Sequence, residues 1–212
     1  MEKIRYITAM YPFAKKLCEV FGVKDLSTIQ NEIPLLKRET DQATVHHHQF
    51  YEWTEGDDFK DMYENFIEVC VRPLYLGPIV VQANPTFRIA YPNNIAVGEF
   101  HKDKNYRDPE WAAKVKEVNY FLPFTDAFGT NTFWAESEED KGDFAPVECD
   151  YGYYVRWDGA NLTHGNKVND TGKTRISVDF RVCEKRNFIP LAQGSINTGK
   201  KFDIGGYYKL YD

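Results

Sequence analysis

From Ile79 onward the chain consists of short apolar segments separated by proline, glycine and asparagine, and this pattern restricts the fold more than any other feature. Segments rich in β-branched and aromatic residues between turn residues are typical of β-strands. So many strands within about a hundred residues favour an antiparallel two-sheet jelly roll, whose mouth can enclose a site. The predicted strands are Ile79–Gln82, Thr86–Tyr91, Val97–Asp103, Glu117–Pro123, Asn131–Glu136, Val147–Cys149, Gly152–Asp158 and Arg175–Cys183.

Residues 1–75 are predicted to be mainly helical and to support this β core. Apolar residues at three-and-four spacing indicate a helix from a cap at Thr8 to about Phe21, and a second helix from residue 57 or 58 to about Val71. A chain of 212 residues is long enough to bury one sizeable core, so we expect a single domain. Its parts are helical support in 1–75, a jelly-roll core in 76–188 and an irregular tail in 189–212.

Charge and composition exclude several classes of function. The formal net charge is -6 and no dense lysine or arginine run occurs, which argues against nucleic-acid and anionic-membrane partners. No apolar run approaches the ~20 residues that span a bilayer. The four cysteines are scattered without a C-x-x-C pair, so we expect reduced thiols in a cytoplasmic protein. The oligomeric state remains open.

Three potential metal ligands stand at informative positions. In a strand His101 and Asp103 would share one face, because successive side chains alternate. His164 can supply a third ligand from a separate segment. Two imidazoles and one carboxylate with open positions opposite them form the ligand set of non-haem Fe(II) oxygenases.

A predicted anion site follows the distal histidine. Arg175 and Ser177 are two residues apart in a strand that alternates polar and apolar residues, so both side chains face the same way. A guanidinium fork beside a hydroxyl is a good receptor for a carboxylate. The same alternation places Ile176, Val178, Phe180 and Val182 on the opposite, packed face.

These residues resemble the 2-oxoglutarate/Fe(II)-dependent dioxygenases, in the branch that contains the streptomycin-biosynthesis G-type proteins, near the phytanoyl-CoA-hydroxylase-like group. The resemblance extends from about Pro85 to Val182. It rests on long, nearly gapless blocks at Glu99–Asp103, Glu117–Thr132, Asp158–Asn166 and Arg175–Val182.

The resemblance implies a double-stranded β-helix and an oxidation that depends on Fe(II) and 2-oxoglutarate. His101, Asp103 and His164 would hold Fe(II), which 2-oxoglutarate would chelate, while Arg175 and Ser177 would bind its distal carboxylate. Molecular oxygen would then be consumed, with release of succinate and CO2. The carboxylate of Asp103 favours hydroxylation over halogenation, but desaturation, cyclisation and epimerisation use the same ligands. We expect a small polar metabolite as substrate, whose identity the sequence does not give.

Other side chains have a possible role at the predicted site. Asn119 and Asn131 would either contact the cosubstrate or tie strands together, because a buried amide needs partners. Arg88 would project from a strand near the mouth and pair with an anionic substrate group. Tyr106 and Arg107 lie in a polar loop after the metal ligands, which is a candidate lid over a polar substrate.

The run His46-His47-His48 invites a metal interpretation, which we do not adopt. It adjoins an aromatic segment that we expect to form a loop or an edge strand on the substrate side. Consecutive histidines in a strand point in alternate directions, so they cannot all bind one ion. A substrate contact by one of them stays open.

Two other functional classes remain open. One is a cupin-like metal-dependent isomerase, or a dioxygenase that does not use 2-oxoglutarate, for which Arg175 and Ser177 would be unnecessary. The other is a catalytically silent jelly-roll binding module, which would need no intact metal ligands.

Overall fold

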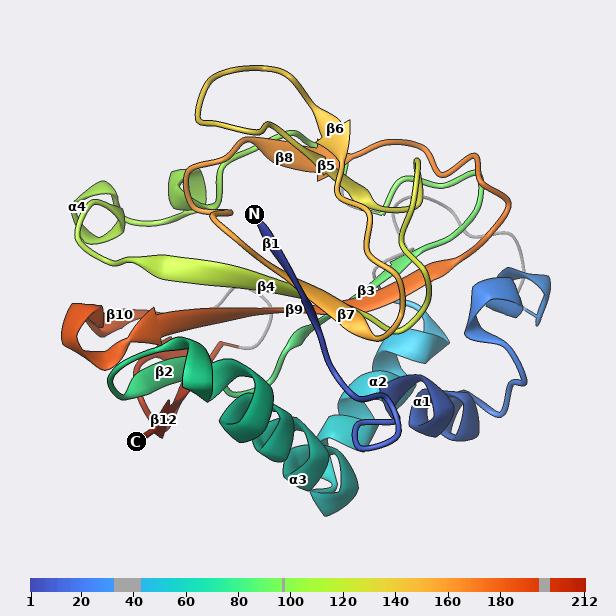
Figure 1. Cartoon of the computed structure of the whole chain (residues 1–212), viewed down its shortest axis with the longest axis horizontal. Coiled ribbons are helices and arrows are strands. Elements are labelled where there is room, and N and C mark those ends of the chain that lie inside the picture. Colours follow the sequence, from blue (N-terminus) through green and yellow to red (C-terminus); the bar gives the residue numbers. More distant parts are fainter. Residues whose placement is uncertain (33–42, 97, 195–198) are drawn as a thin grey trace.

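The computed structural model describes residues 1–32, 43–96, 98–194 and 199–212, and it confirms a mainly β fold with flanking helices in a double-stranded β-helix (Figure 1). The large sheet has the order β1-β7-β4-β9-β2-β12, with β3 also paired to β9, and the small sheet has the order β6-β5-β8. The strands are β1 (Glu2–Arg5), β2 (Ile79–Gln82), β3 (Thr86–Ala90), β4 (Glu117–Pro123), β5 (Phe133–Ala135), β6 (Ala145–Pro146), β7 (Tyr153–Trp157), β8 (His164–Asn166), β9 (Arg175–Glu184), β10 (Leu191–Gly194), β11 (Lys201–Phe202) and β12 (Tyr208–Tyr211).

Three layers lie above one another in Figure 1: the small sheet, the large sheet and then helices α1, α2 and α3, while α4 lies at the left beside β4. The α-helices are α1 (Phe13–Phe21), α2 (Val45–Glu55), α3 (Asp57–Phe66) and α4 (Pro109–Ala112), and α3 continues as a π-helical turn over Ile67–Val71. Shorter 3₁₀ turns cover Leu26–Glu32, Arg72–Leu74, Asp103–Tyr106 and Lys185–Asn187. Within the described residues, no helix is long and apolar enough to cross a bilayer.

Strand β9 separates two hydrophobic cores. Its apolar residues Ile176, Val178, Phe180 and Val182 are buried in the core that the helices share with the large sheet. On the other side of the sheet, Phe121 of β4 and Phe133 of β5 belong to the core between the two sheets. The polar residues of β9 face that second side, as their alternation predicts. They therefore lie between the sheets, where the jelly roll encloses a site.

The beginning of the first predicted helix was wrong. Thr8 does not cap it: α1 begins at Phe13, directly after Pro12, and residues 8–11 form a turn. Proline has a fixed φ and no backbone N–H, which suits the start of a helix and not its interior. The predicted stop at Gly22 is confirmed, because this residue has φ 69° and its N–H bonds the last turn.

The strand predicted over Val97–Asp103 was also wrong. Val97 lies outside the described residues, and the segment after it forms no strand. His101 makes a single antiparallel bridge with His164, and Asp103 begins a 3₁₀ turn while its N–H donates to Gly159 O at 3.0 Å. The segment therefore contacts the first residue of β8 and the loop before it, and it forms no strand of its own.

The segment after residue 188 is not an irregular tail. Strands β10 and β11 pair with each other, and β12 pairs antiparallel with β2, with Tyr208 opposite Gln82. Tyr208 and Tyr211 are buried, and their rings explain why this stretch is ordered against the sheet. The first residues likewise supply β1, which pairs with β7 at the other edge.

The histidine run lies in helix α2, so the loop or edge strand expected there was wrong. Thr44 precedes the helix, and its hydroxyl and backbone N–H lie 2.9 and 3.4 Å from Nδ1 of His47, which closes a capping box. His46 Nδ1 lies 3.0 Å from the Tyr91 hydroxyl. Both imidazoles are buried, and burial lowers the pKa of His46 and lowers that of His47 to about 4. They are neutral core residues.

The buried His47 predicts an acid-sensitive fold. A histidine whose pKa falls on folding favours the native state above its unfolded pKa of about 6.5, and this contribution is lost as the pH falls toward 4. His47→Gln keeps a residue suited to the capping box and removes the titration. Between pH 7 and pH 4, the free energy of unfolding in urea should therefore fall by about 3 kcal/mol less in His47→Gln than in the wild type. Equal losses in the two proteins would contradict this assignment.

Candidate metal centre

Three side chains meet at the open edge of the small sheet, and they are the predicted ligands. Potential ligand atoms of His101, Asp103 and His164 all lie within 4.8 Å of one another. Asp103 Oδ1 is 3.5 Å from His101 Nε2 and 3.7 Å from His164 Nε2. The two histidines are neighbours through their backbones, which exchange hydrogen bonds of 2.8 and 2.9 Å. The convergence of the three groups is thus built on main-chain pairing.

Backbone carbonyls fix the orientation of both imidazoles. His101 Nδ1 lies 2.8 Å from Glu99 O, and His164 Nδ1 lies 2.9 Å from Leu162 O. A carbonyl oxygen only accepts, so each Nδ1 donates and a neutral ring keeps its lone pair on Nε2. This outer support is the usual companion of a metal-binding histidine. The two rings therefore present their Nε2 atoms to the same point as Asp103 Oδ1, which fits a metal ion.

The charges of the three groups suit a cation. Burial opposes ionisation of Asp103, but Arg181, the two histidines and Asn119 hold its pKa well below the usual range. The interaction with Asp103 raises the pKa of His101, whereas burial lowers that of His164. A carboxylate and two histidines in these positions supply one negative charge in a partly buried site. A divalent ion would bind the carboxylate of Asp103 and the neutral imidazoles of His101 and His164, and it would compete with protons for these groups.

The ligands open into a cavity of about 100 Å³ between the sheets. The residues around it come from β2, β3, β4, β5, β7, β8 and β9, together with Ala96, His101 and Asp103. Three aromatic side chains, Phe121, Phe133 and Trp157, pack near the metal ligands, and the indole of Trp157 lies edge-on to His164 at 4.7 Å between ring centroids. The cavity therefore has apolar walls and a polar floor formed by β9.

Arg175 lies in this cavity, and Ser177 lies beside it as predicted. Its side chain is 3% exposed, Nη1 donates to Ser177 Oγ at 2.7 Å, and Nε donates to the Asn131 carbonyl at 3.0 Å. Burial lowers the pKa of Arg175 to about 10, so it is protonated at neutral pH. No described carboxylate forms an ion pair with it. Asp179, whose charge acts on Arg175, pairs instead with Arg88 at 3.3 Å.

The two asparagines occupy different positions. Asn119 lines the cavity, and its Nδ2 donates to Asp103 Oδ2 at 2.8 Å. The amide of Asn131 serves a turn, since its Oδ1 accepts from Phe128 N at 2.8 Å, while its backbone carbonyl positions Arg175. The structure thus brings Asn119 to the metal ligands and gives Asn131 a supporting place.

The three predicted substrate contacts, Arg88, Tyr106 and Arg107, lie in different places. Arg88 lines the metal cavity with Asp179. The ring of Tyr106 is edge-on to His101 at 5.1 Å and is 55% exposed. Arg107 points away, and its guanidinium lies 4.0 Å from the centre of the Phe202 ring. Of the two residues predicted in the lid, Tyr106 therefore contacts a candidate metal ligand, and Arg107 joins the loop to the C-terminal segment.

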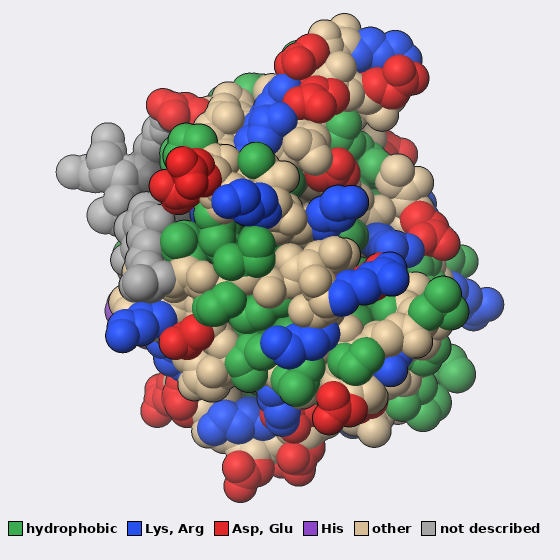
Figure 2. All heavy atoms as spheres, turned by 90° about the vertical axis from the view of Figure 1, so that its left-hand side faces the viewer, with side chains coloured by type: hydrophobic (Ala, Val, Ile, Leu, Met, Phe, Trp, Pro, Cys, Tyr) green, Lys and Arg blue, Asp and Glu red, His purple; other side chains and the backbone are tan. Residues whose placement is uncertain are grey.

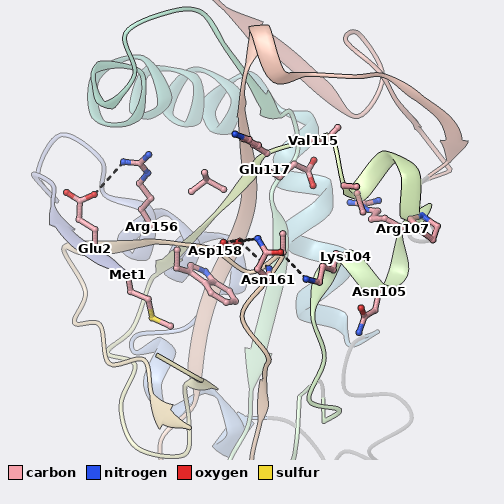
Figure 3. A pocket seen from close by; sticks show the side chains of 17 residues that line it. Met1, Glu2, Lys104, Asn105, Arg107, Val115, Glu117, Arg156, Asp158 and Asn161 are labelled. Atoms are coloured by element: carbon pink, nitrogen blue, oxygen red, sulfur yellow. Dashed lines mark hydrogen bonds and ion pairs between the residues drawn. The ribbon is translucent and has the colours of Figure 1, made fainter. Parts of the chain in front are cut away.

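A larger groove of about 1130 Å³ lies next to this site (Figure 3). Glu117, Lys104, Asp158 and Asn161 surround it in Figure 3, and Lys104 Nζ lies 3.1 Å from Asn161 Oδ1. Trp157 lines both the groove and the metal cavity. Figure 2 views the molecule from the side of α4, where lysine and arginine side chains stand among hydrophobic ones.

One curated protein is similar to the chain over nearly its whole length. The streptomycin biosynthesis protein StrG of Streptomyces griseus is 35% identical over 207 residues, which cover 97% of this chain and 96% of that protein. The chain belongs to the StrG family. No protein-family model matches it. The StrG relationship covers both the metal cavity and the groove, because it spans the chain.

Solved structures are similar at a much lower level. The non-haem α-ketoglutarate-dependent carbocyclase SnoK from nogalamycin biosynthesis is 12% identical with a TM-score of 0.49, over 99% of this chain and 91% of SnoK. The non-haem monooxygenase ThoJ, in a nickel complex, is 14% identical with a TM-score of 0.48, over 86% of this chain and 72% of ThoJ.

Sequence reasoning missed two supports of the candidate metal centre. Arg181 Nη2 donates to Asp103 Oδ2 at 2.9 Å, although nothing in an alternating strand distinguishes this arginine from a surface residue. The second support comes from the acidic run 136–143 after β5, where Glu139 pairs with Lys102 at 3.0 Å and with Lys104 at 2.6 Å, on either side of Asp103. In the sequence, only the many acidic residues of this run could have indicated a contact with lysines.

Gly159 allows the close approach of Asn119, which predicts a sensitive position. A Cβ at residue 159 would lie 2.6 Å from Asn119 Nδ2 and 2.7 Å from its Cγ, so the amide would have to leave Asp103. We expect Gly159→Ala to weaken binding of Co(II) to the apo protein by about tenfold, as loss of an outer-shell partner does. Spectroscopic titration measures this. Gly77→Ala, where no atom lies within 4 Å, is the matched control, and equal affinities would refute the prediction.

Proposed function

We propose that this chain is a non-haem Fe(II) enzyme that uses 2-oxoglutarate and O2 to oxidise a small polar metabolite. The simplest reaction is hydroxylation, in which 2-oxoglutarate, O2 and a substrate C–H give succinate, CO2 and the alcohol. One observation carries the proposal: a buried guanidinium without a carboxylate partner among the described residues shares a cavity with two histidines and an aspartate.

The environment of Arg175 favours an anionic ligand. Burying a cation without a counterion is strongly unfavourable, and the neutral acceptors Ser177 Oγ and Asn131 O offset only part of this cost. A carboxylate would form charge-assisted hydrogen bonds with the fork. Phe121 lies under the guanidinium at 5.7 Å and keeps that end of the cavity apolar. A dicarboxylate that reaches from Arg175 to the triad fits these requirements.

The three candidate metal ligands and the aromatic residues around them would have different roles in the reaction. His101 and His164 would hold the metal through Nε2, and Asp103 through Oδ1. When bound, Fe(II) with 2-oxoglutarate would activate O2, which is the oxidant for cleavage of the substrate C–H bond. Phe133 and Trp157 would exclude water from the ligands, which limits unproductive turnover. The protein thus provides geometry, charge and exclusion of solvent.

The substrate would enter the cavity beside Arg88. The pair of Arg88 and Asp179 is partly exposed within the cavity and offers both a donor and an acceptor. Tyr106 would close over the histidines from the loop that follows Asp103. These groups support a polar substrate, and they support hydroxylation no more than desaturation, cyclisation or epimerisation.

Anaerobic titration with Fe(II) and then 2-oxoglutarate tests the proposal. We expect a visible charge-transfer band that requires both additions, followed by succinate formation when O2 and a substrate are supplied. Asp103→Ala should lose the band because it loses a ligand. Folded protein that binds the metal but gives no band would favour a cupin-like isomerase or a dioxygenase without 2-oxoglutarate, and absence of metal binding would favour a silent binding module.

Arg175 gives a separate prediction. Arg175→Met removes the charged hydrogen bonds to the distal carboxylate, so the dissociation constant of 2-oxoglutarate should rise at least ~30-fold, or about 2 kcal/mol. The affinity for Fe(II) should change little, because Arg175 contacts none of the triad. Arg156→Met on strand β7 of the same sheet is the control, since its guanidinium pairs with Glu2 at 3.6 Å. Unchanged 2-oxoglutarate binding by Arg175→Met would contradict the assigned role.

A further inference from the structure

The two oxygens of Asp103 face different neighbours. Oδ1 lies nearest the histidines, at 3.5 and 3.7 Å from their Nε2 atoms. Oδ2 accepts from Asn119 Nδ2 at 2.8 Å and from Arg181 Nη2 at 2.9 Å. The lone pairs of Oδ2 are therefore engaged by protein donors, and Oδ1 is the atom left to bind a metal.

Strand register explains why these two donors meet at Asp103. Asn119 of β4 and Arg181 of β9 are directly opposite each other in the antiparallel ladder. Both residues line the cavity. Side chains of such a pair stand close together on one face of the sheet. A shift of one residue would turn both away from Asp103.

Arg181 is held at its other end by residues from outside the candidate metal centre. Its Nη1 lies 3.3 Å from the Tyr207 hydroxyl, and its Nε lies 3.9 Å from Glu117 Oε2. Glu117 in turn accepts a hydrogen bond from the hydroxyl of Tyr208, the first residue of β12. Figure 3 shows Glu117 at the wall of the groove. The guanidinium is thus fixed between the ligand carboxylate and the C-terminal segment.

We infer that Arg181 is a positioning residue that restricts Asp103 to one metal-binding oxygen. The inference rests on the proposed function. Three protein ligand atoms would leave three positions of a six-coordinate ion open, which 2-oxoglutarate and O2 together require. A carboxylate that bound through both oxygens would occupy one of these positions. Arg181 prevents this by holding Oδ2, and Tyr207, Tyr208 and Glu117 keep Arg181 in place.

The arginines of β9 therefore have different tasks although both face the cavity. Arg175 has no described carboxylate partner and is free to bind an anion, whereas Arg181 already pairs with Asp103. The ion pair is expected to matter for geometry more than for stability, because desolvation of the two charges offsets much of their attraction. Its loss should appear first in metal binding.

Titration of the apo protein with Co(II), without 2-oxoglutarate, tests this role. We expect Arg181→Met to bind Co(II) ~10–100-fold more weakly, because Asp103 loses a partner that orients it. The visible d–d bands should also change, because only Asn119 would still hold Oδ2. Arg181→Lys keeps the charge but not the fork, so it should recover only part of the affinity. Arg156→Met should match the wild type in both readouts.

The outcomes separate the two proposals. Wild-type protein that does not bind Co(II) would overturn the proposed function together with this inference. Wild-type binding, with the same affinity and spectrum in Arg181→Met, would overturn the inference alone. Thermal unfolding of each apo variant checks the fold. Where Arg181→Met does not fold, Arg181→Lys decides the matter, since wild-type affinity and spectrum in that variant would also refute the positioning role.

Discussion

The antiparallel pairing of β4 with β9 is the interaction on which the rest of this structure depends. The ladder runs from Glu117 opposite Cys183 to Pro123 opposite Ser177, at the centre of the large sheet. On one face it buries Tyr120 against Phe180, with ring centroids 5.0 Å apart, in the core shared with the helices. On the other face the same register supplies the floor of the metal cavity. Packing and site geometry are therefore two sides of one ladder.

Much of the β core and the meeting of the three candidate metal ligands could be predicted from the sequence. Alternation in Arg175–Glu184 gives both the strand and the face of each side chain, because a period of two is a local property. His101, Asp103 and His164 meet as expected even though residues 98–103 are not a strand. Their convergence comes from the bridge between the two histidines. The meeting of these three side chains was therefore predicted correctly, and the local structure that carries it was not.

Features that depend on distant partners could not be predicted. The helix α2 begins with histidines of low helix propensity, and it is stabilised by the cap at Thr44 and by burial of His46 and His47. Strand β12 is too short to stand out, and its existence depends on the edge of β2. In each case the deciding contact joins segments that no local window contains.

The two arginines of β9 show how ion pairing separates structural groups from binding groups. They are six positions apart on one face, and sequence gives them the same chemistry. Only the location of Asp103 distinguishes them, because its carboxylate neutralises Arg181 and leaves Arg175 to neutral acceptors. Arg175 has only neutral partners and lies in the same cavity as the three candidate metal ligands. It is therefore Arg175, and not Arg181, that indicates an anionic ligand.

The indole of Trp157 has a consequence for the range of molecules that this scaffold can accept. It is shared by the small cavity and the large groove, and it also packs against His164. A smaller side chain there would join the two spaces and admit a bulkier compound, but it would remove the ring that packs against the candidate metal ligand His164. Substrate size and ligand rigidity are thus linked through one residue, so diversification of this family toward larger substrates would require compensating support for the histidine.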